Sequence, residues 1–179
     1  MRVIEHRRHT MRTKPGQHLS QAGVELARRA GEGMGRFDRV VTSRVPRAFE
    51  TALAMGYAVD EQLEELSATP DALAAELDWR EGCPAFQRAA RAAGVAAGYV
   101  DQQGAVMRAI AAALSEGGSA LVISHGGIVE AGAVGCRPGD DFAAWGPACG
   151  YCEGIRLTFE GDRCVAAELL RVPGSLLES

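Results

Sequence analysis

The stretch SALVISHGGIVEAGAVG, residues 119–135, decides how this chain is expected to fold. Its first part, 119–123, is an apolar run of the right length for one buried strand. Gly126 and Gly127 then allow a tight turn, and a helix is expected from Ile128 onward. A buried strand that leads directly into a helix is typical of a parallel sheet covered by helices on both faces.

The same alternation of strand and helix continues along the chain. Ser20 is a suitable N-cap for a helix with one apolar face, and Gly56 is a suitable stop for the next helix. Residues 60–95 are charged and rich in alanine, which predicts one or two irregular helices with loops. The other expected elements are strands at 2–6 and 37–43, helices at 19–35, 44–56, 100–118 and 128–135, and two late strands over 152–172 joined by a turn at 160–162. The fold class expected is α/β, a three-layer sandwich around a central, mostly parallel sheet.

Composition and charge are those of an ordinary globular protein. At 179 residues, with 47% hydrophobic and 23% charged residues, the chain can bury a core as one domain over residues 1–179. The net charge of −4 gives no reason to expect a nucleic acid or an acidic membrane surface as partner. No stretch approaches the ~18 apolar residues of a membrane span, and the N-terminus lacks a secretory pattern, so we expect a cytoplasmic protein.

The cysteines do not indicate a metal or redox site. Their number is odd, and in a chain without an export signal they are expected to be reduced thiols. Cys149 and Cys152 form a C-x-x-C motif, CGYC, but no second pair of cysteines or histidines stands at the spacing of zinc ligands. We therefore expect no metal and no cofactor. The cysteines are Cys83, Cys136, Cys149, Cys152 and Cys164.

The segment EHRRHT, residues 5–10, places a basic spot at the end of the first strand of a mildly acidic protein. His6 lies one strand step from Ile4 and is expected to be a packed or surface histidine. In a parallel sheet, ligands bind beyond the carboxyl ends of the strands, so polar groups at several strand ends indicate one shared crevice. Three strand ends carry such groups here: Arg8-His9, Ser43 to Arg47, and Ser124 to Gly126.

Two arginines and two histidines in one crevice suit a phosphate dianion. Arginine matches the geometry of phosphate through paired hydrogen bonds. A neutral imidazole is a competent nucleophile near pH 7, and its attack on phosphorus gives a covalent phosphohistidine. Surrounding cations would offset the charge on the transferred group, while a carboxylic acid would protonate the leaving oxygen.

Four segments carry a resemblance to a known family, and they occur in the family's order over residues 2–127. RRHTMR resembles the Arg-His-Gly signature that opens the histidine phosphatase superfamily, the phosphoglycerate mutase-like proteins. HLSQAGVELA is similar to that family's Leu-Thr-x-x-Gly-x-x-Gln-Ala segment, TSRVPRAFETA to its Ser-x-x-x-Arg-Ala-x-x-Thr-Ala helix, and VISHGG to its second-histidine strand. The resemblance, to a short member of the branch 1 type, implies the phosphoglycerate mutase-like sandwich and phosphoryl transfer.

The resemblance also implies roles for individual residues. His9 would be the phosphorylated nucleophile, and His125 would stand beside it as a second cationic donor. The substrate-binding residues implied are Arg8, Arg12, Arg47 and Gly126. The family's proton donor often lies in a Leu-x-Glu segment, which LEEL at 63–66 matches. That assigns the role to Glu65 before Glu64, although both could simply belong to a solvated acidic face.

This sequence departs from the family pattern at two positions of the first motif. Thr10 replaces the usual glycine, which would narrow the approach to phosphate or add a hydroxyl donor. Pro15 stands where mutase-type members have asparagine. Both departures bear on the class of substrate more than on the type of reaction.

Three functions from different classes follow. The first is a metal-independent phosphomonoesterase that acts on a phosphorylated small molecule or a phosphoprotein, including protein phosphohistidine. The second is a phosphoglycerate mutase-type phosphoryl transferase; the short, alanine-rich interval before the second histidine favours hydrolysis over this alternative. The third is a catalytically silent phosphate-binding module, which the presence of both histidines and both main arginines disfavours.

Overall fold

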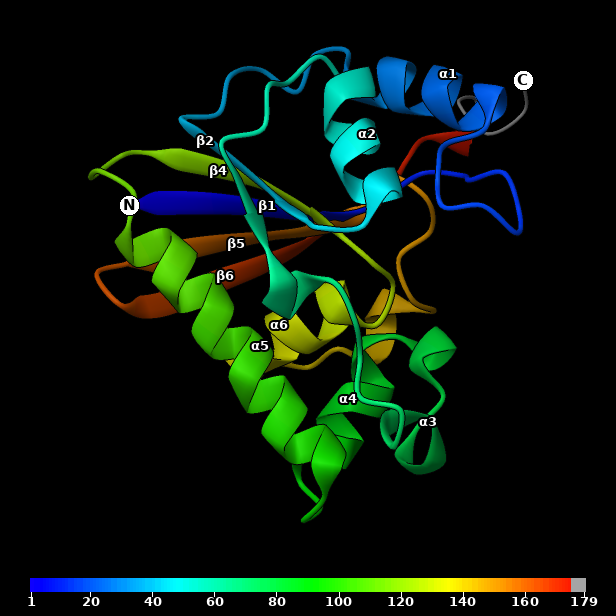
Figure 1. Cartoon of the computed structure of the whole chain (residues 1–179). Coiled ribbons are helices and arrows are strands. Elements are labelled where there is room, and N and C mark those ends of the chain that lie inside the picture. The colour runs from blue at the N-terminus through cyan, green and yellow to red at the C-terminus, as the bar shows by residue number, and fades with distance from the viewer. Residues whose placement is uncertain (175–179) are drawn as a thin grey trace.

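Residues 1–174, which the computed structural model describes, form one six-stranded sheet with helices packed on both faces (Figure 1). The strands are β1 (Arg2–Arg8), β2 (Arg39–Ser43), β3 (Glu61–Leu63), β4 (Ser119–Ser124), β5 (Gly154–Glu160) and β6 (Arg163–Leu170). The helices are α1 (Gln21–Gly31), α2 (Pro46–Ala54), α3 (Leu73–Glu76), α4 (Cys83–Ala90), α5 (Val95–Ala112) and α6 (Ile128–Cys136). Short 3-10 helices lie at η1 (Glu64–Leu66), η2 (Trp79–Glu81) and η3 (Ala143–Trp145).

The strand order is β3-β2-β4-β1-β5-β6. The first four strands in this order pair in parallel, whereas β5 pairs antiparallel with both β1 and β6. The carboxyl ends of β2, β4 and β1 are therefore neighbours at one edge of the sheet, as the mostly parallel sheet of an α/β sandwich requires.

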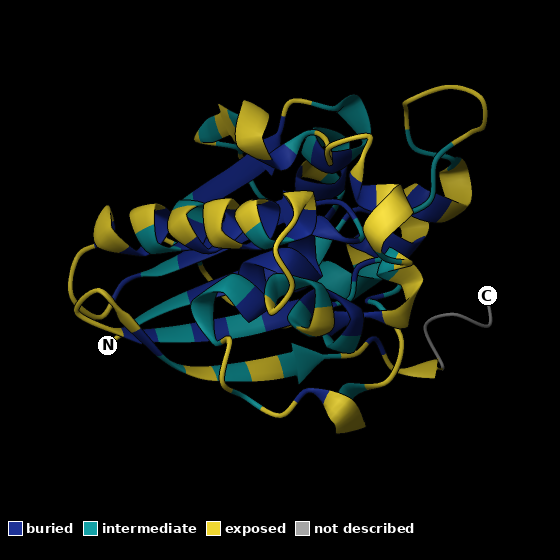
Figure 2. Ribbon diagram, turned by 90° about the horizontal axis from the view of Figure 1, so that it is seen from below, coloured by how far each residue is buried: buried dark blue, intermediate teal, exposed yellow. Residues whose placement is uncertain are grey.

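Alternating side chains of the strands build two separate cores. On one face, Ile4 and Val122 pack in a cluster with residues of α4, α5 and α6, including Met107. On the other face, Leu121 and Ile123 pack in a second cluster with residues of α1 and α2. Figure 2 shows the buried strands between helices whose outer sides are exposed. The three layers predicted from the sequence are confirmed.

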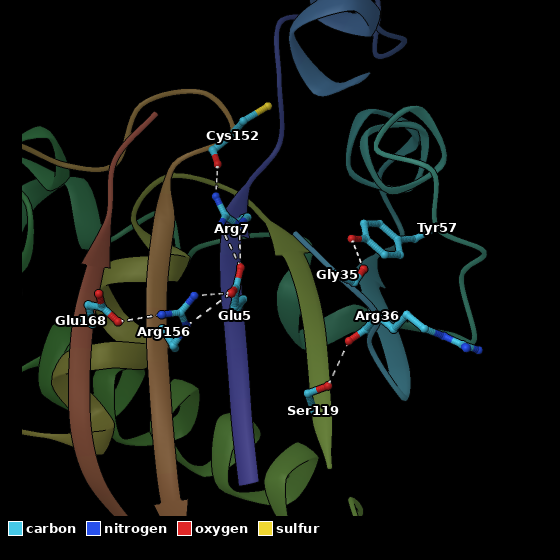
Figure 3. Close-up of polar contacts among 9 residues, drawn as sticks. All are labelled: Glu5, Arg7, Gly35, Arg36, Tyr57, Ser119, Cys152, Arg156 and Glu168. Atoms are coloured by element: carbon cyan, nitrogen blue, oxygen red, sulfur yellow. Dashed lines mark hydrogen bonds and ion pairs between the residues drawn. The ribbon is translucent and has the colours of Figure 1, made fainter. Parts of the chain in front are cut away.

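The polar residues of β1 are accommodated on opposite faces of the sheet. Glu5 and Arg7 lie on the α1/α2 face, where charged side chains of β1 and β5 pair with one another. The Glu5 carboxylate is 2.8 Å from both Arg7 Nη2 and Arg156 Nη2, and Arg156 reaches Glu168 on β6 at 2.8 Å (Figure 3). His6 points to the opposite face and is fully buried, as a packed histidine.

Most expected elements are present with shifted ends. Ser20 is the N-cap of α1, because its side chain accepts a hydrogen bond from the Gly23 N–H, and Gly56 follows α2 with φ 95°. The 60–95 region holds a short strand, β3, that the sequence did not predict, and α5 begins before residue 100, the expected start. Within residues 1–174, no helix combines the length and apolar character needed to cross a membrane.

Candidate active site

The two histidines predicted to act together lie side by side at the carboxyl edge of the sheet. His9 directly follows β1 and His125 directly follows β4, which is the neighbour of β1. Their ring centroids are 5.0 Å apart in an edge-to-face arrangement. Arg47, in the first turn of α2, reaches both rings. The expected convergence of His9, Arg47 and His125 is therefore present.

The hydrogen bonds of His9 assign its tautomer. Its Nδ1 lies 2.6 Å from the backbone carbonyl of Thr10, and a carbonyl can only accept, so Nδ1 carries the hydrogen. The Nε2 atom then holds a lone pair, to which Arg47 Nε donates at 3.0 Å. Thr51 Oγ1 accepts from the Thr10 N–H at 3.1 Å and fixes the backbone that orients the ring. His9 thus presents a nucleophilic nitrogen at the crevice.

His125 has the opposite tautomer. Arg47 Nη2 lies 3.2 Å from its Nδ1, and because a guanidinium only donates, Nδ1 is the acceptor. The hydrogen is then on Nε2, which donates to Ser43 Oγ at 2.9 Å. The end of β2 therefore holds the second histidine in place.

Both histidines are neutral at physiological pH in this arrangement. Burial lowers the pKa of His9 to about 4, and the cations of Arg47, Arg8 and Arg12 contribute to the lowering. Burial lowers the pKa of His125 to about 3, with further lowering by its cationic neighbours. The resemblance implied a cationic His125, whereas the lowered pKa favours its neutral form. A phosphate dianion beside the ring would favour its protonation, because an opposite charge stabilises the charged form.

Arg8 is held by one backbone carbonyl and by two aromatic rings. Its Nη1 donates to the Cys149 carbonyl at 2.9 Å. Its guanidinium carbon lies 4.7 Å from the ring centroid of Tyr151 and 5.3 Å from that of Trp79. Cation–ring contacts of this kind attract a guanidinium to the face of the ring. Arg8 therefore reaches the crevice as a fixed cation.

The two remaining substrate-binding predictions lie near the same crevice. Arg12 contributes to the lowered pKa of both His9 and Arg47, but its Nη1 is engaged by the carbonyls of Pro15 and Gly16, at 3.1 and 2.6 Å. At Gly126, a Cβ atom would come within 2.4 Å of the Trp79 ring.

Glu65 is not joined to this cluster by any contact among the described residues. It lies in η1, after β3, and its backbone carbonyl accepts a hydrogen bond from Gln103 Nε2 at 2.8 Å. Glu65 is among the residues that line two hollows against α5. Glu64 lies 3.8 Å from Arg44 and is largely exposed. The proton-donor role of Glu65 remains a prediction.

Four residues of the site had no role in the sequence reasoning. Ser43 appeared only as a strand end, yet it orients His125. Gln17 accepts a hydrogen bond from Arg47 Nη1. Tyr151 flanks His9, with ring centroids 6.0 Å apart, and Trp79 covers Gly126. The position of Ser43 between a predicted strand and Arg47 was the one signal that could have identified it.

Comparison with known proteins identifies the family of the chain. The model of the histidine phosphatase superfamily (branch 1) matches residues 4–170. Similar solved structures include a phosphoserine phosphatase from Entamoeba histolytica, at 14% identity, with a TM-score of 0.67 and coverage of 95% of this chain and 97% of that one. The protein histidine phosphatase SixA, complexed with tungstate, is 18% identical, with a TM-score of 0.64 and coverage of 97% and 99%.

A mycobacterial glucosyl-3-phosphoglycerate phosphatase is 19% identical, with a TM-score of 0.59 and coverage of 95% of this chain and 98% of that one. No curated protein matches the sequence. At these identities the solved structures establish a shared fold, and the match to the family model spans nearly the whole chain. The chain belongs to branch 1 of the histidine phosphatase superfamily.

Proposed function

We propose that this protein is a metal-independent phosphomonoester hydrolase that works through a covalent phosphate on His9. The observation that carries the proposal is the pair of contacts of the His9 ring, Nδ1 with the Thr10 carbonyl and Nε2 with Arg47. The Thr10 carbonyl holds the hydrogen on Nδ1, so the Nε2 lone pair points to Arg47 beside His125. A neutral, oriented imidazole among guanidinium groups suits attack on a phosphoryl group.

The reaction would proceed in two displacements. In the first, the His9 Nε2 lone pair forms a bond to phosphorus while the bond from phosphorus to the leaving oxygen breaks, and that oxygen takes up a proton. In the second, water attacks the phosphohistidine, the N–P bond breaks and its electron pair returns to Nε2. Arg8, Arg47 and His125 would stabilise the charge on the phosphoryl oxygens in both steps.

Glu65 is the proposed source of the proton for the leaving group and the acceptor of the proton from water. The support is the match of LEEL to the family's Leu-x-Glu segment. No contact links Glu65 to His9 within residues 1–174, so in this role the leaving group of the ester would lie between the two side chains. Aryl phosphates and phosphohistidine need little help from an acid, since their leaving groups depart readily.

The proposed substrate is a phosphorylated metabolite or a protein phosphohistidine. The proposed location of the protein is the cytoplasm. Solved structures with the same fold include enzymes named for phosphoserine, for glucosyl-3-phosphoglycerate and for protein histidine phosphate. The five cysteines are free thiols, which suits a reducing compartment. A screen of phosphorylated metabolites and of a phosphohistidine-carrying protein would identify the substrate.

The test is turnover of 4-nitrophenyl phosphate in the presence of EDTA, followed by rapid quench. We expect turnover, and a trapped phosphate that is stable to base, labile to acid and missing from His9→Ala. Normal turnover by His9→Ala would refute the mechanism. A phosphoenzyme that passes its phosphate to a second metabolite faster than to water would indicate the mutase-type transferase. Phosphate binding without turnover would indicate the silent module.

A further inference from the structure

The CGYC segment forms a tight turn between η3 and β5 whose two cysteines belong to different cores. Cys149 packs in the cluster on the α4–α6 face of the sheet, and Cys152 packs in the cluster on the α1/α2 face. Burial is the main cause that raises the pKa of both thiols, that of Cys152 to about 11. The two residues thus anchor the turn on either side of the sheet and leave Tyr151 between them, half-buried, at the crevice.

Polar contacts from distant segments fix the backbone of this turn. The buried carboxylate of Glu130 in α6 accepts from the Cys149 N–H and from the Gly127 N–H, both at 2.7 Å. It therefore ties the turn to the loop that carries His125. From β1, the Arg8 carbonyl accepts from the Cys152 N–H at 3.1 Å, and Arg7 Nη1 donates to the Cys152 carbonyl at 3.0 Å (Figure 3).

The turn also holds a strained backbone conformation. Cys152 has φ 61°, and it is the one residue other than glycine with positive φ in the part of the chain that the structure describes. Such a conformation costs free energy and persists only where the surroundings impose it, often at a functional site. Here the strain lies next to Tyr151.

The ring of Tyr151 contacts the catalytic residues that the turn faces. It lies 6.0 Å from the His9 ring and 4.7 Å from the Arg8 guanidinium carbon. Arg8 Nε is buried and has no hydrogen-bond partner among residues 1–174. The orientation of the guanidinium therefore depends on the Cys149 carbonyl and on the faces of Tyr151 and Trp79, and two of these three come from the CGYC turn.

We propose that Tyr151 is the positioning residue for Arg8. The CGYC turn holds the Tyr151 ring rigidly against the Arg8 guanidinium, so that Arg8 binds the phosphoryl group in one orientation. This inference rests on the proposed function, because it assigns Arg8 to the bound phosphate. It gives the C-x-x-C motif a role in which neither thiol reacts.

The test measures binding of inorganic phosphate by calorimetry, together with turnover of 4-nitrophenyl phosphate. We expect Tyr151→Leu to weaken phosphate binding by about tenfold, the value of one partly desolvated cation–ring contact. Tyr151→Phe keeps the ring and should recover most of that affinity. In an Arg8→Gln background, Tyr151→Leu should cause little further loss, because residues that act through one contact are not additive.

The matched control is Tyr57→Leu. Tyr57 is a half-buried tyrosine on the α1/α2 side whose hydroxyl donates to the Gly35 carbonyl at 2.8 Å (Figure 3). The aromatic rings that Arg8 contacts among the described residues are those of Trp79 and Tyr151. Phosphate affinity should be unchanged in this variant. If Tyr151→Leu does not fold, Tyr151→Met removes the ring and retains a long apolar side chain.

Each outcome distinguishes the inference from the function it rests on. Unchanged phosphate affinity in Tyr151→Leu, or equal losses in Tyr151→Leu and Tyr151→Phe, would overturn the inference while turnover through His9 stands. Ring-dependent phosphate binding in a protein without turnover would support the inference and overturn the proposed hydrolysis.

Discussion

Arg47 Nε donates a hydrogen bond to His9 Nε2 at 3.0 Å, so the cation is bound to the atom that we propose as nucleophile. The same guanidinium reaches His125 Nδ1 at 3.2 Å. A phosphoryl group entering the crevice would take these donors from the two rings and release the His9 lone pair. Arg47 would thus keep the crevice ordered before it binds substrate.

This geometry predicts a large effect of Arg47→Lys. A lysine keeps the charge, but its single ammonium group cannot span two rings or bind phosphate through paired donors. We expect kcat/KM for 4-nitrophenyl phosphate to fall by about 100-fold, as for removal of one oriented donor to a transition state. The control is Arg44→Lys, at an exposed neighbouring position that pairs with Glu64, and it should stay within about twofold of the native value. An Arg47→Lys enzyme with near-native kcat/KM would remove Arg47 from the mechanism.

Gly126→Ala should disturb the site through packing alone. The new methyl group would meet the Trp79 ring at 2.4 Å, which forces the ring to move, and Trp79 also contacts Arg8. We expect a loss of about 1–3 kcal/mol in the free energy of unfolding, as for other overpacked sites, together with reduced kcat/KM. Gly139→Ala provides the comparison, since nothing lies within 4 Å of its Cβ position. Urea unfolding of both variants checks the difference, and equal stabilities would contradict it.

Glu65→Gln should separate substrates by their leaving groups if Glu65 donates the proton. Alkyl phosphates should be hydrolysed much more slowly, whereas aryl phosphates with good leaving groups should lose little, because only the alkoxide needs the acid. Glu64→Gln is the matched control and should affect neither class. Equal losses on both substrates would indicate a structural role for Glu65 instead. If Glu65→Gln hydrolyses alkyl and aryl phosphates at native rates, phosphohistidine becomes the favoured substrate class, because its imidazole departs readily.

Acid should destabilise the protein through its buried histidines. Burial lowers the pKa of His6 to about 3, below the ordinary value of 6.5. As the pH falls, His6 is therefore protonated in the unfolded chain before it is protonated in the folded protein. The stabilising contribution of neutral His6 is complete above pH 6.5 and is lost as the pH falls toward 3. Between pH 7 and pH 5 this loss is about 2 kcal/mol for one such histidine.

His6→Gln tests that prediction because it removes the titrating imidazole. In the native protein the Nε2 atom of this ring lies 2.6 Å from Ser124 Oγ. The free energy of unfolding in urea should fall less between pH 7 and pH 5 in the variant than in the native protein. The variant should also keep its phosphohistidine, since His6 is not the nucleophile. An identical pH dependence in the two proteins would mean that folding does not lower the pKa of His6.

The sequence predicted those parts of the fold and site that depend on local pattern. Apolar runs located the central strands, and the strand ends located His9, Arg47 and His125. The short strand β3 was missed because its residues, Glu61 to Leu63, are too few and too polar to form a recognisable apolar run.

The rest of the site depends on contacts between segments far apart in the chain. Tyr151 and Trp79 meet Arg8 from a turn and a 3-10 helix that no periodicity marks. The polar character of β1 had a similar cause, because Glu5 is balanced by Arg156 from a strand near the other end of the chain. Pairings of this kind follow from topology and cannot be found by inspecting one segment.

The charges on the α1/α2 face of β1 also determine how the strands align. Glu5 and Arg156 are direct partners in the register of β1 with β5. Since side chains alternate between the faces, a slip of β1 by one residue would turn Glu5 and Arg7 into the apolar core and place Ile4 among the charged groups of the α1/α2 face. It would also carry His9 out of line with His125. The ion pair of Glu5 with Arg156 thus favours one register of β1 with β5, and that register determines where His9 lies relative to His125 at the edge of the sheet.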